Sequence, residues 1–165
     1  MYEARKICNF LLAHYDADRF DLTNLRINKL LFFIHAEGLE TRPDGLVRNH
    51  FEAWKFGPVV RPVYDEFNKY GEGVITQPAT FLDYSIGKKV PVPFDDITTV
   101  DRDLIAKTFI EYSRFTTGQL VALSHEPGGP WDVIFRQQLA DKTLSPRIPN
   151  ELIRAHQSGK SAVKH

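Results

Sequence analysis

The segment that follows Thr23 is apolar around almost its whole circumference when it is placed on a helix. Its apolar residues recur at helical spacing, and two phenylalanines widen the apolar surface: Ile27, Leu30, Leu31 and Ile34, with Phe32 and Phe33. A helix that is apolar on all sides is normally buried by other elements. Thr23 can cap its N-terminus, and Gly38 marks its end. The sequence therefore predicts a central, buried helix around which the fold is built.

Several shorter segments can pack against this helix. The N-terminal segment has one apolar stripe, with Asn9 on its polar side. The other segments carry residues that typically start, cap or stop helices, namely Pro62, Gly71, Asp101, Thr116 with Gln119, Pro130 and Pro149. We predict a mainly α fold, a compact single-domain bundle of about six helices over residues 1–158, with a frayed C-terminal tail over residues 159–165.

Extended structure is predicted in two places. The turn residues from Arg42 to Gly45 precede a short extended stretch from Phe51 to Phe56, which suggests a small β-hairpin or short strands. Residues 72–100 are rich in proline and glycine and are long for a structureless connection. We expect them to form short extended pieces packed over the core.

Composition excludes several functional classes. The 21 lysines and arginines are balanced by 21 acidic residues, so the chain lacks the positive field that non-specific nucleic-acid binding uses, and we expect no nucleic-acid partner. The single cysteine, Cys8, cannot build a disulfide framework or a cysteine-rich zinc site, and it suits a reducing compartment. No apolar run approaches the roughly 20 residues that span a bilayer. We expect a cytoplasmic protein without a membrane partner.

The histidines suggest no catalytic or metal site. His35 and Glu37 resemble the ligand and acid of a zinc deaminase, but that chemistry needs two further thiolates, so we interpret His35 as a packed or surface histidine. His125 and Glu126 could act as an acid and base, yet no nucleophile elbow precedes them. Gly128-Gly129 lacks the lysine and hydroxyl residue of a phosphate loop. We assign no catalytic residue, metal or cofactor, and a small hydrolase using His125 and Glu126 remains an alternative, as does a DNA-binding repressor.

The stretch from Phe51 to Val60 is the most unusual in the chain, because aromatic, cationic and rigid residues follow one another there. Large aromatic side chains dominate binding hot spots, since they bury much area for little lost rotamer freedom. We predict a partner-binding surface made by the exposed parts of Lys55, Phe56, Pro58, Tyr64 and Tyr70. Trp54 is expected to support this surface from beneath.

Three motifs, in order, give the chain a family resemblance. They are Lys29-Leu30-Leu31-Phe32-Phe33, the run Glu52-Ala53-Trp54-Lys55-Phe56-Gly57-Pro58-Val59-Val60 continuing to Val63 and Tyr64, and Leu120, Leu123 and His125 followed by Pro130 and Trp131. With these motifs the chain resembles the Panacea antitoxin domain, the SocA-like or phage-associated family, over residues 1 to about 155. The sequence departs from the family pattern where Phe32-Phe33 replaces the more familiar Tyr-Tyr and where Gly128-Gly129 lengthens the approach to Trp131.

The resemblance implies a mostly helical fold and a role in a bacterial or prophage toxin-antitoxin module. Such domains neutralise a separately encoded protein toxin by direct binding, and different members accompany very different toxins. One branch acts instead as a proteolytic adaptor that delivers its toxin to an ATP-dependent protease. The cognate toxin is thus the expected partner, and the protease is a second partner under the adaptor alternative. The resemblance also implies structural roles for the motif residues Lys29, Leu30, Leu31, Glu52, Trp54, Gly57, His125 and Trp131.

Overall fold

A computed structural model describes the backbone of residues 1–163 and the side chains of residues 1–159. Its helices, in chain order, are α1 (Ala4–His14), α2 (Asn24–Thr41), α3 (Arg61–Phe67), the 3-10 turn η1 (Asn68–Tyr70), α4 (Thr99–Ser113), α5 (Thr117–Ser124), α6 (Pro130–Ala140) and α7 (Asn150–Val163). Its strands are β1 (Phe51–Trp54), β2 (Gly57–Val59), β3 (Thr80–Asp83), β4 (Lys88–Pro91) and β5 (Arg147–Ile148). The mainly α prediction is confirmed, although the described residues contain seven α-helices rather than six, and the short strands mean that the fold is not all-α.

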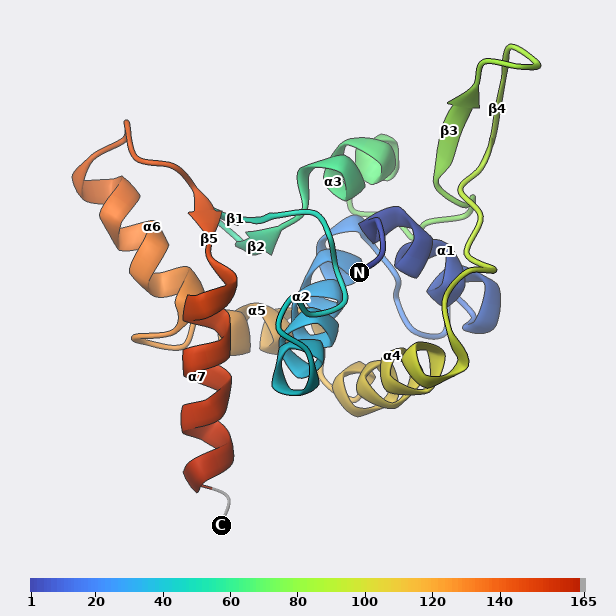
Figure 1. The fold of residues 1–165 in the computed structure, drawn as a ribbon. Helices are drawn as coiled ribbons and strands as arrows, with labels where there is room; N and C mark the ends of the chain where they lie inside the picture. Colours follow the sequence, from blue (N-terminus) through green and yellow to red (C-terminus); the bar gives the residue numbers. More distant parts are fainter. Residues whose placement is uncertain (164–165) are drawn as a thin grey trace.

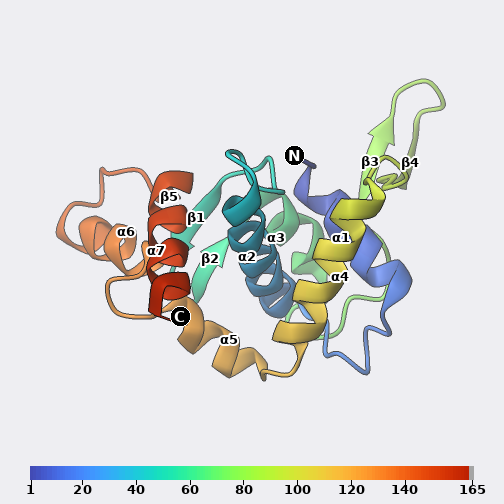
Figure 2. The ribbon, with the colours of Figure 1, turned by 60° about the horizontal axis from the view of Figure 1, so that its bottom comes forward.

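Helix α2 occupies the centre of the molecule, as predicted (Figure 2). It contacts α1, α3, α4, α5, α7 and β2, and its predicted inward residues, among them Ile27 and Leu30, are fully buried. The side chain of Thr23 accepts a hydrogen bond from the backbone N–H of Arg26, so the predicted cap is confirmed. The helix continues past Gly38 to Thr41, and Gly38 serves close packing, because a Cβ there would lie 2.8 Å from a side-chain carbon of Leu46.

Helix α4 begins earlier than the sequence indicates. Thr98, not Asp101, is its N-cap, and its hydroxyl accepts the backbone N–H of Asp101. Asp101 is buried in the first turn, where it forms an ion pair with Arg42 and accepts a hydrogen bond from the hydroxyl of Tyr2. Burial acts to raise the pKa of Asp101, but these hydrogen bonds hold it below the ordinary value. Asp101 therefore ties α4 to two distant segments instead of capping the helix.

The strands form two small antiparallel sheets. In the first, β1 lies between β2 and β5, with Glu52 opposite Val59 and Phe51 opposite Ile148. Strand β5 has two residues and carries no signal that the sequence analysis detected. The second sheet is the hairpin β3–β4, which lies in the segment 72–100. Its ends join the core through buried residues such as Ala79 and Val92, but the hairpin itself projects from the body rather than packing over it (Figure 1).

Helix α7 runs through Gly159 to Val163, so the helix is longer than the sequence indicates. The end of the predicted frayed tail, residues 164–165, lies outside the described residues. Pro149 directly precedes α7, and Pro130 begins α6, close to the predicted starts. Across the part of the chain that the structure describes, no helix combines the length and apolarity that a membrane crossing requires.

Candidate functional site: the motif cluster and the surface above it

Four motif residues from three separate stretches of the chain meet in one place, and we call them the motif cluster: Lys29, Gly57, His125 and Trp131. At its centre is Lys29 in α2, whose side chain is fully buried and whose ammonium group donates a 2.7 Å hydrogen bond to the backbone carbonyl of Pro58. The neighbouring Asn28 accepts a 2.9 Å hydrogen bond from the backbone N–H of Val60. Two consecutive polar side chains of a buried helix therefore hold the β2 segment in place.

Gly57 allows this close approach between α2 and β2. Its φ is +103°, in the region where side chains are strained. A Cβ at this position would lie 2.6 Å from the Cε of Lys29 and 2.7 Å from the hydroxyl oxygen of Ser124. Only glycine fits here without displacing one of these two side chains.

Trp131 and His125 complete the cluster from α5 and α6. The indole N–H of Trp131 donates a 2.8 Å hydrogen bond to the backbone carbonyl of Trp54, at the end of β1. The imidazole of His125 stacks on the indole of Trp131 with ring centroids 3.6 Å apart and planes inclined by 6°. The ring of Phe135 also stacks on this indole, with ring centroids 4.6 Å apart. The cluster thus joins α2, β1, β2, α5 and α6 around the β1–β2 turn.

Burial favours the neutral forms of both bases in this cluster. It lowers the pKa of Lys29 from 10.5 to about 7. Burial also lowers the pKa of His125, and the charge of Lys29 adds to the effect. The Nε2 atom of His125 is buried without a hydrogen-bond partner among the described residues. Because Lys29 meets no solvent, its amine acts in this conformation as a tie between helix and turn.

The residues considered for acid-base or metal chemistry have other partners. Glu126 forms a 3.1 Å hydrogen bond with His156 of α7. His35 accepts a 3.0 Å hydrogen bond from the backbone N–H of Val47 through Nδ1, and its Nε2 lies 3.0 Å from the side-chain oxygen of Asn150. The interpretation of His35 as a packed histidine is therefore confirmed. Across the described residues, no group of three or more histidine, cysteine and acidic side chains could hold a metal ion.

Above the cluster, the outer face of β1 carries an aromatic and charged surface. Phe51 and Ala53 point into the core, so Glu52 and Trp54 face outward. The indole N–H of Trp54 donates a 2.8 Å hydrogen bond to Glu52, the guanidinium of Arg61 lies 5.1 Å from the Trp54 ring centroid, and the ring of Tyr64 lies 4.8 Å away. Trp54 is half-buried, with the guanidinium of Arg61 over its ring, and its role in supporting a partner surface stays a prediction.

The predicted contact residues fall into three groups. Lys55 and Phe56 form the β1–β2 turn, where Phe56 is 58% exposed and the Lys55 ammonium group lies 5.3 Å from its ring centroid. The ring of Tyr64 packs against the ring of Trp54, the residue that precedes Lys55. Tyr70 lies apart in η1, where its ring is near the ring of Phe67 and the ammonium group of Lys69. Pro58 is buried in β2, so it offers no surface to a partner, and its carbonyl serves Lys29 instead.

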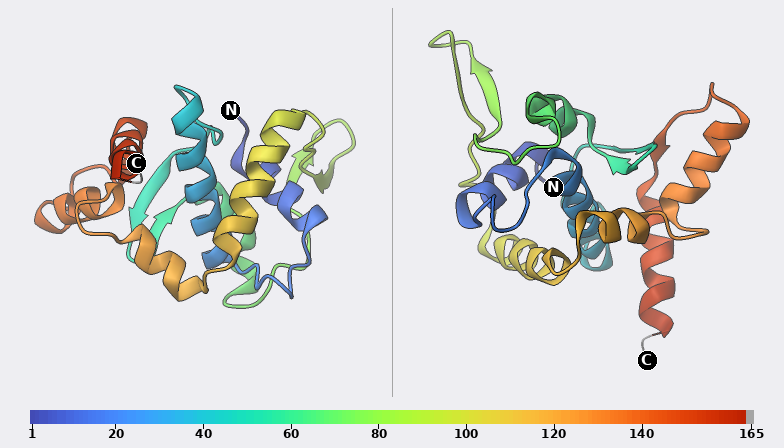
Figure 3. Two further views of the ribbon diagram at one scale, coloured as in Figure 1. Left: turned by 90° about the horizontal axis from the view of Figure 1, so that it is seen from below. Right: turned by 180° about the vertical axis from the view of Figure 1, so that it is seen from behind.

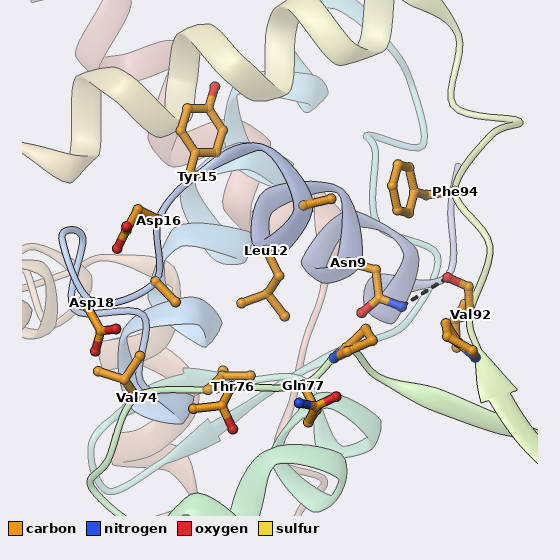
Figure 4. A pocket seen from close by; sticks show the side chains of 15 residues that line it. Asn9, Leu12, Tyr15, Asp16, Asp18, Val74, Thr76, Gln77, Val92 and Phe94 are labelled. Carbon is orange, nitrogen blue, oxygen red and sulfur yellow. Dashed lines mark hydrogen bonds between the residues drawn. The ribbon is translucent and has the colours of Figure 1, made fainter.

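A second feature, beside α1, was not detected from the sequence. A pocket of about 540 Å³ lies between α1 with the residues 15–18 that follow it, the segment 74–78 and the chain around the end of β4 (Figure 4). Asn9, expected on the polar side of α1, is only 2% exposed. Its amide donates hydrogen bonds of 2.9 Å to the carbonyls of Ala79 and Val92 and accepts one of 2.7 Å from the N–H of Ala79. Asn9 therefore clamps the base of the β3–β4 hairpin.

Comparison with known proteins places the motif cluster in a family. The family model described as Antitoxin SocA-like, Panacea domain, matches residues 27–132. The protein Antitoxin SocA of Caulobacter vibrioides (strain NA1000 / CB15N) is 36% identical over 155 residues, which cover 92% of this chain and 80% of the relative. No solved structure matches the chain significantly. The matched range contains all the residues of the motif cluster from Lys29 to Trp131, and this chain belongs to the SocA-like antitoxin family with the Panacea domain.

Proposed function

We propose that this chain is the antitoxin of a toxin-antitoxin module and neutralises its cognate protein toxin by direct binding in the cytoplasm, without a cofactor. Membership of the SocA-like family and the printed name of the Caulobacter relative support an antitoxin role. The observation that carries direct binding is the exposed aromatic turn held on a rigid base. Lys29, Gly57 and Trp131 hold the turn from within, and Phe56 is exposed at its tip.

The proposed contact surface consists of Lys55, Phe56 and Tyr64, with Tyr70 at its margin. A turn that is already ordered loses little conformational entropy when a partner covers it, so more of the contact energy appears as affinity. Phe56 exposes a large aromatic ring with the ammonium group of Lys55 beside it, and the guanidinium of Arg61 lies over the ring of Trp54. This combination of aromatic and cationic side chains is typical of binding hot spots.

The test is co-expression of this chain with the product of the gene adjacent to its own. The proposal predicts that the neighbouring product alone arrests growth, that this chain restores growth, and that the two proteins co-purify as a stable complex. Restored growth without a complex, accompanied by a shortened toxin half-life that depends on an ATP-dependent protease, would assign the adaptor role instead. Failure of both rescue and complex formation would contradict the proposal.

The His125→Ala variant distinguishes neutralisation by binding from neutralisation by hydrolysis. His125 stacks on Trp131 and so supports the fold, and the substitution is therefore read together with a thermal unfolding curve. A folded His125→Ala protein that still neutralises the toxin agrees with the binding proposal. A folded variant that binds the toxin but no longer neutralises it would favour the hydrolase alternative.

A further inference from the structure

The β3–β4 hairpin has a shape and a surface that the fold itself does not require. It rises from the body beside α1 and α3 and stands clear of other elements in both the front and the rear view (Figure 1 and Figure 3). Four of its large apolar side chains are exposed, two of them at the tip: Phe81 at 38%, Leu82 at 43%, Tyr84 at 88% and Ile86 at 57%. Exposed apolar residues that gather in one place commonly mark an interaction site.

Both faces of the hairpin carry the same kind of surface. Directly paired residues of an antiparallel sheet lie on one face, so Phe81 with Val90 and Leu82 with Lys89 belong to opposite faces. By the same alternation, Lys88 lies on the face of Phe81. Each face therefore has an exposed apolar side chain and one lysine. A hairpin that packs on its own domain has one buried and one polar face, whereas this pattern suits insertion into a groove that contacts both faces.

The two lysines of the hairpin form no ion pair with the described part of the chain. The carboxylate of Asp83, which pairs with Lys88 across the strands, accepts hydrogen bonds from the backbone N–H and the hydroxyl of Ser85 at 2.9 and 2.6 Å. Among the described residues, neither Lys88 nor Lys89 forms an ion pair within 4.0 Å. Two exposed cations beside apolar side chains match an acidic surface on a partner.

Hydrogen bonds anchor the base of the hairpin to the body, whereas the side chains at its tip are exposed. Asn9 joins the chain on both sides of the hairpin through the three hydrogen bonds described above. Arg5 donates a 2.9 Å hydrogen bond to the carbonyl of Thr80, and Glu66 of α3 accepts the N–H of Thr80 at 3.2 Å. An isolated two-stranded hairpin is only marginally stable, so these anchors supply the order that it lacks.

We propose that the β3–β4 hairpin inserts into an acidic-rimmed groove of the toxin, with Tyr84 and Ile86 leading and Lys88 and Lys89 pairing with the rim. This inference rests on the proposed function and names a second contact element for it. Helix α3 connects the two elements, since Tyr64 lies in its first turns and Glu66 binds the hairpin base. The hairpin and the β1–β2 turn flank α3 (Figure 1), so one partner seated across α3 reaches both.

The experiment measures binding of the purified chain to the purified product of the adjacent gene, for the natural sequence and two double variants. Lys88→Glu with Lys89→Glu reverses the charge, and Tyr84→Ser with Ile86→Ser removes the apolar tip. The matched controls change exposed residues elsewhere, namely Lys107→Glu with Lys142→Glu for charge and Val100→Ser with Leu139→Ser for apolar surface. Thermal unfolding and gel filtration of each variant establish that the fold and the oligomeric state are unchanged.

The proposal predicts that each hairpin variant weakens binding about tenfold or more, while the controls stay within about twofold. The charge-reversal variant should also lose most of the salt dependence of the association rate. Toxin binding by the natural chain that is unaffected in both hairpin variants would overturn the hairpin inference and leave the proposed function standing. No binding by the natural chain would overturn both. A natural chain that is a dimer and becomes monomeric on substitution of Tyr84 and Ile86 would assign the hairpin to self-association instead.

Discussion

The ammonium group of Lys29 donates a 2.7 Å hydrogen bond to the backbone carbonyl of Pro58 inside the protein, where the lysine has no exposed surface. This single contact joins the central helix to the turn that presents Phe56. It also joins two of the sequence motifs through residues that lie 29 positions apart in the chain. A buried lysine is costly in its charged form, so the contact has consequences for stability that can be measured.

Stability should rise with pH because of Lys29. Its pKa is about 7 in the folded protein and 10.5 ordinarily, so between these values the unfolded chain binds more protons than the folded one. The cost of burying the ammonium group is thus largest below about pH 7 and disappears as pH approaches 10.5. The unfolding free energy of the natural protein minus that of Lys29→Met should increase by on the order of 1 kcal/mol per pH unit between pH 7 and 10. A difference that does not change with pH in urea titrations would contradict this account.

Gly57→Ala should destabilise the protein by about 2–4 kcal/mol, because the new Cβ strains a backbone at φ +103° and collides with Lys29 and Ser124. Gly118→Ala is the matched control. Gly118 lies in α5, and a Cβ there would meet nothing within 4 Å, so this change should stabilise by up to about 1 kcal/mol. Thermal unfolding of the two variants gives the comparison. Equal effects of the two substitutions would show that the space around Gly57 is not limiting.

Asn9→Leu should loosen the hairpin before it unfolds the domain. The substitution removes three hydrogen bonds and takes the Asn9 partner from the N–H of Ala79 and from the carbonyl of Val92, while the Ala79 carbonyl still accepts the N–H of Val92, so we expect a cost of about 2–3 kcal/mol. Native-state hydrogen exchange should then accelerate across residues 79–92, while the amides of β1 and β2 serve as the internal control. Uniform acceleration throughout the chain would show that Asn9 supports the whole core rather than the hairpin.

Phe56→Ser should weaken toxin binding about tenfold or more without lowering the thermal midpoint, because the ring is 58% exposed at the β1–β2 turn. Surface plasmon resonance with immobilised toxin measures the change, mainly in the dissociation rate. Leu144→Ser, at a residue 45% exposed in the α6–β5 connection, is the control. Equal affinities for both variants would remove the β1–β2 turn from the proposed interface.

Local signals were sufficient for much of the fold. The apolar circumference of α2, the Thr23 cap and the capping box of Thr116 and Gln119 are all confirmed, because each depends on residues within one or two helical turns. Asp101 shows where such reasoning stops. Thr98 and Asp101 both suit a helix N-terminus, and the choice between them depends on Tyr2 and Arg42, which are distant in the chain.

The candidate site was recognised as separate motifs and not as one place. Lys29, Gly57, His125 and Trp131 come together only through tertiary packing, which no pattern within a single segment reports. Pro58 was assigned to the surface for the same reason, although the Lys29 contact requires it to lie inside. Asn9 gave no signal, because a polar residue beside an apolar stripe ordinarily faces solvent, and its partners are some 70 and 83 residues away.

Neutralisation by direct binding is best tested by titration calorimetry of the purified toxin, encoded beside this chain, with the purified natural chain. The account predicts saturable binding at a fixed stoichiometry, accompanied by loss of toxin activity in the same mixture with no protease or nucleotide present. Absence of binding, or binding that leaves the toxin fully active until a protease is added, would contradict neutralisation by direct contact.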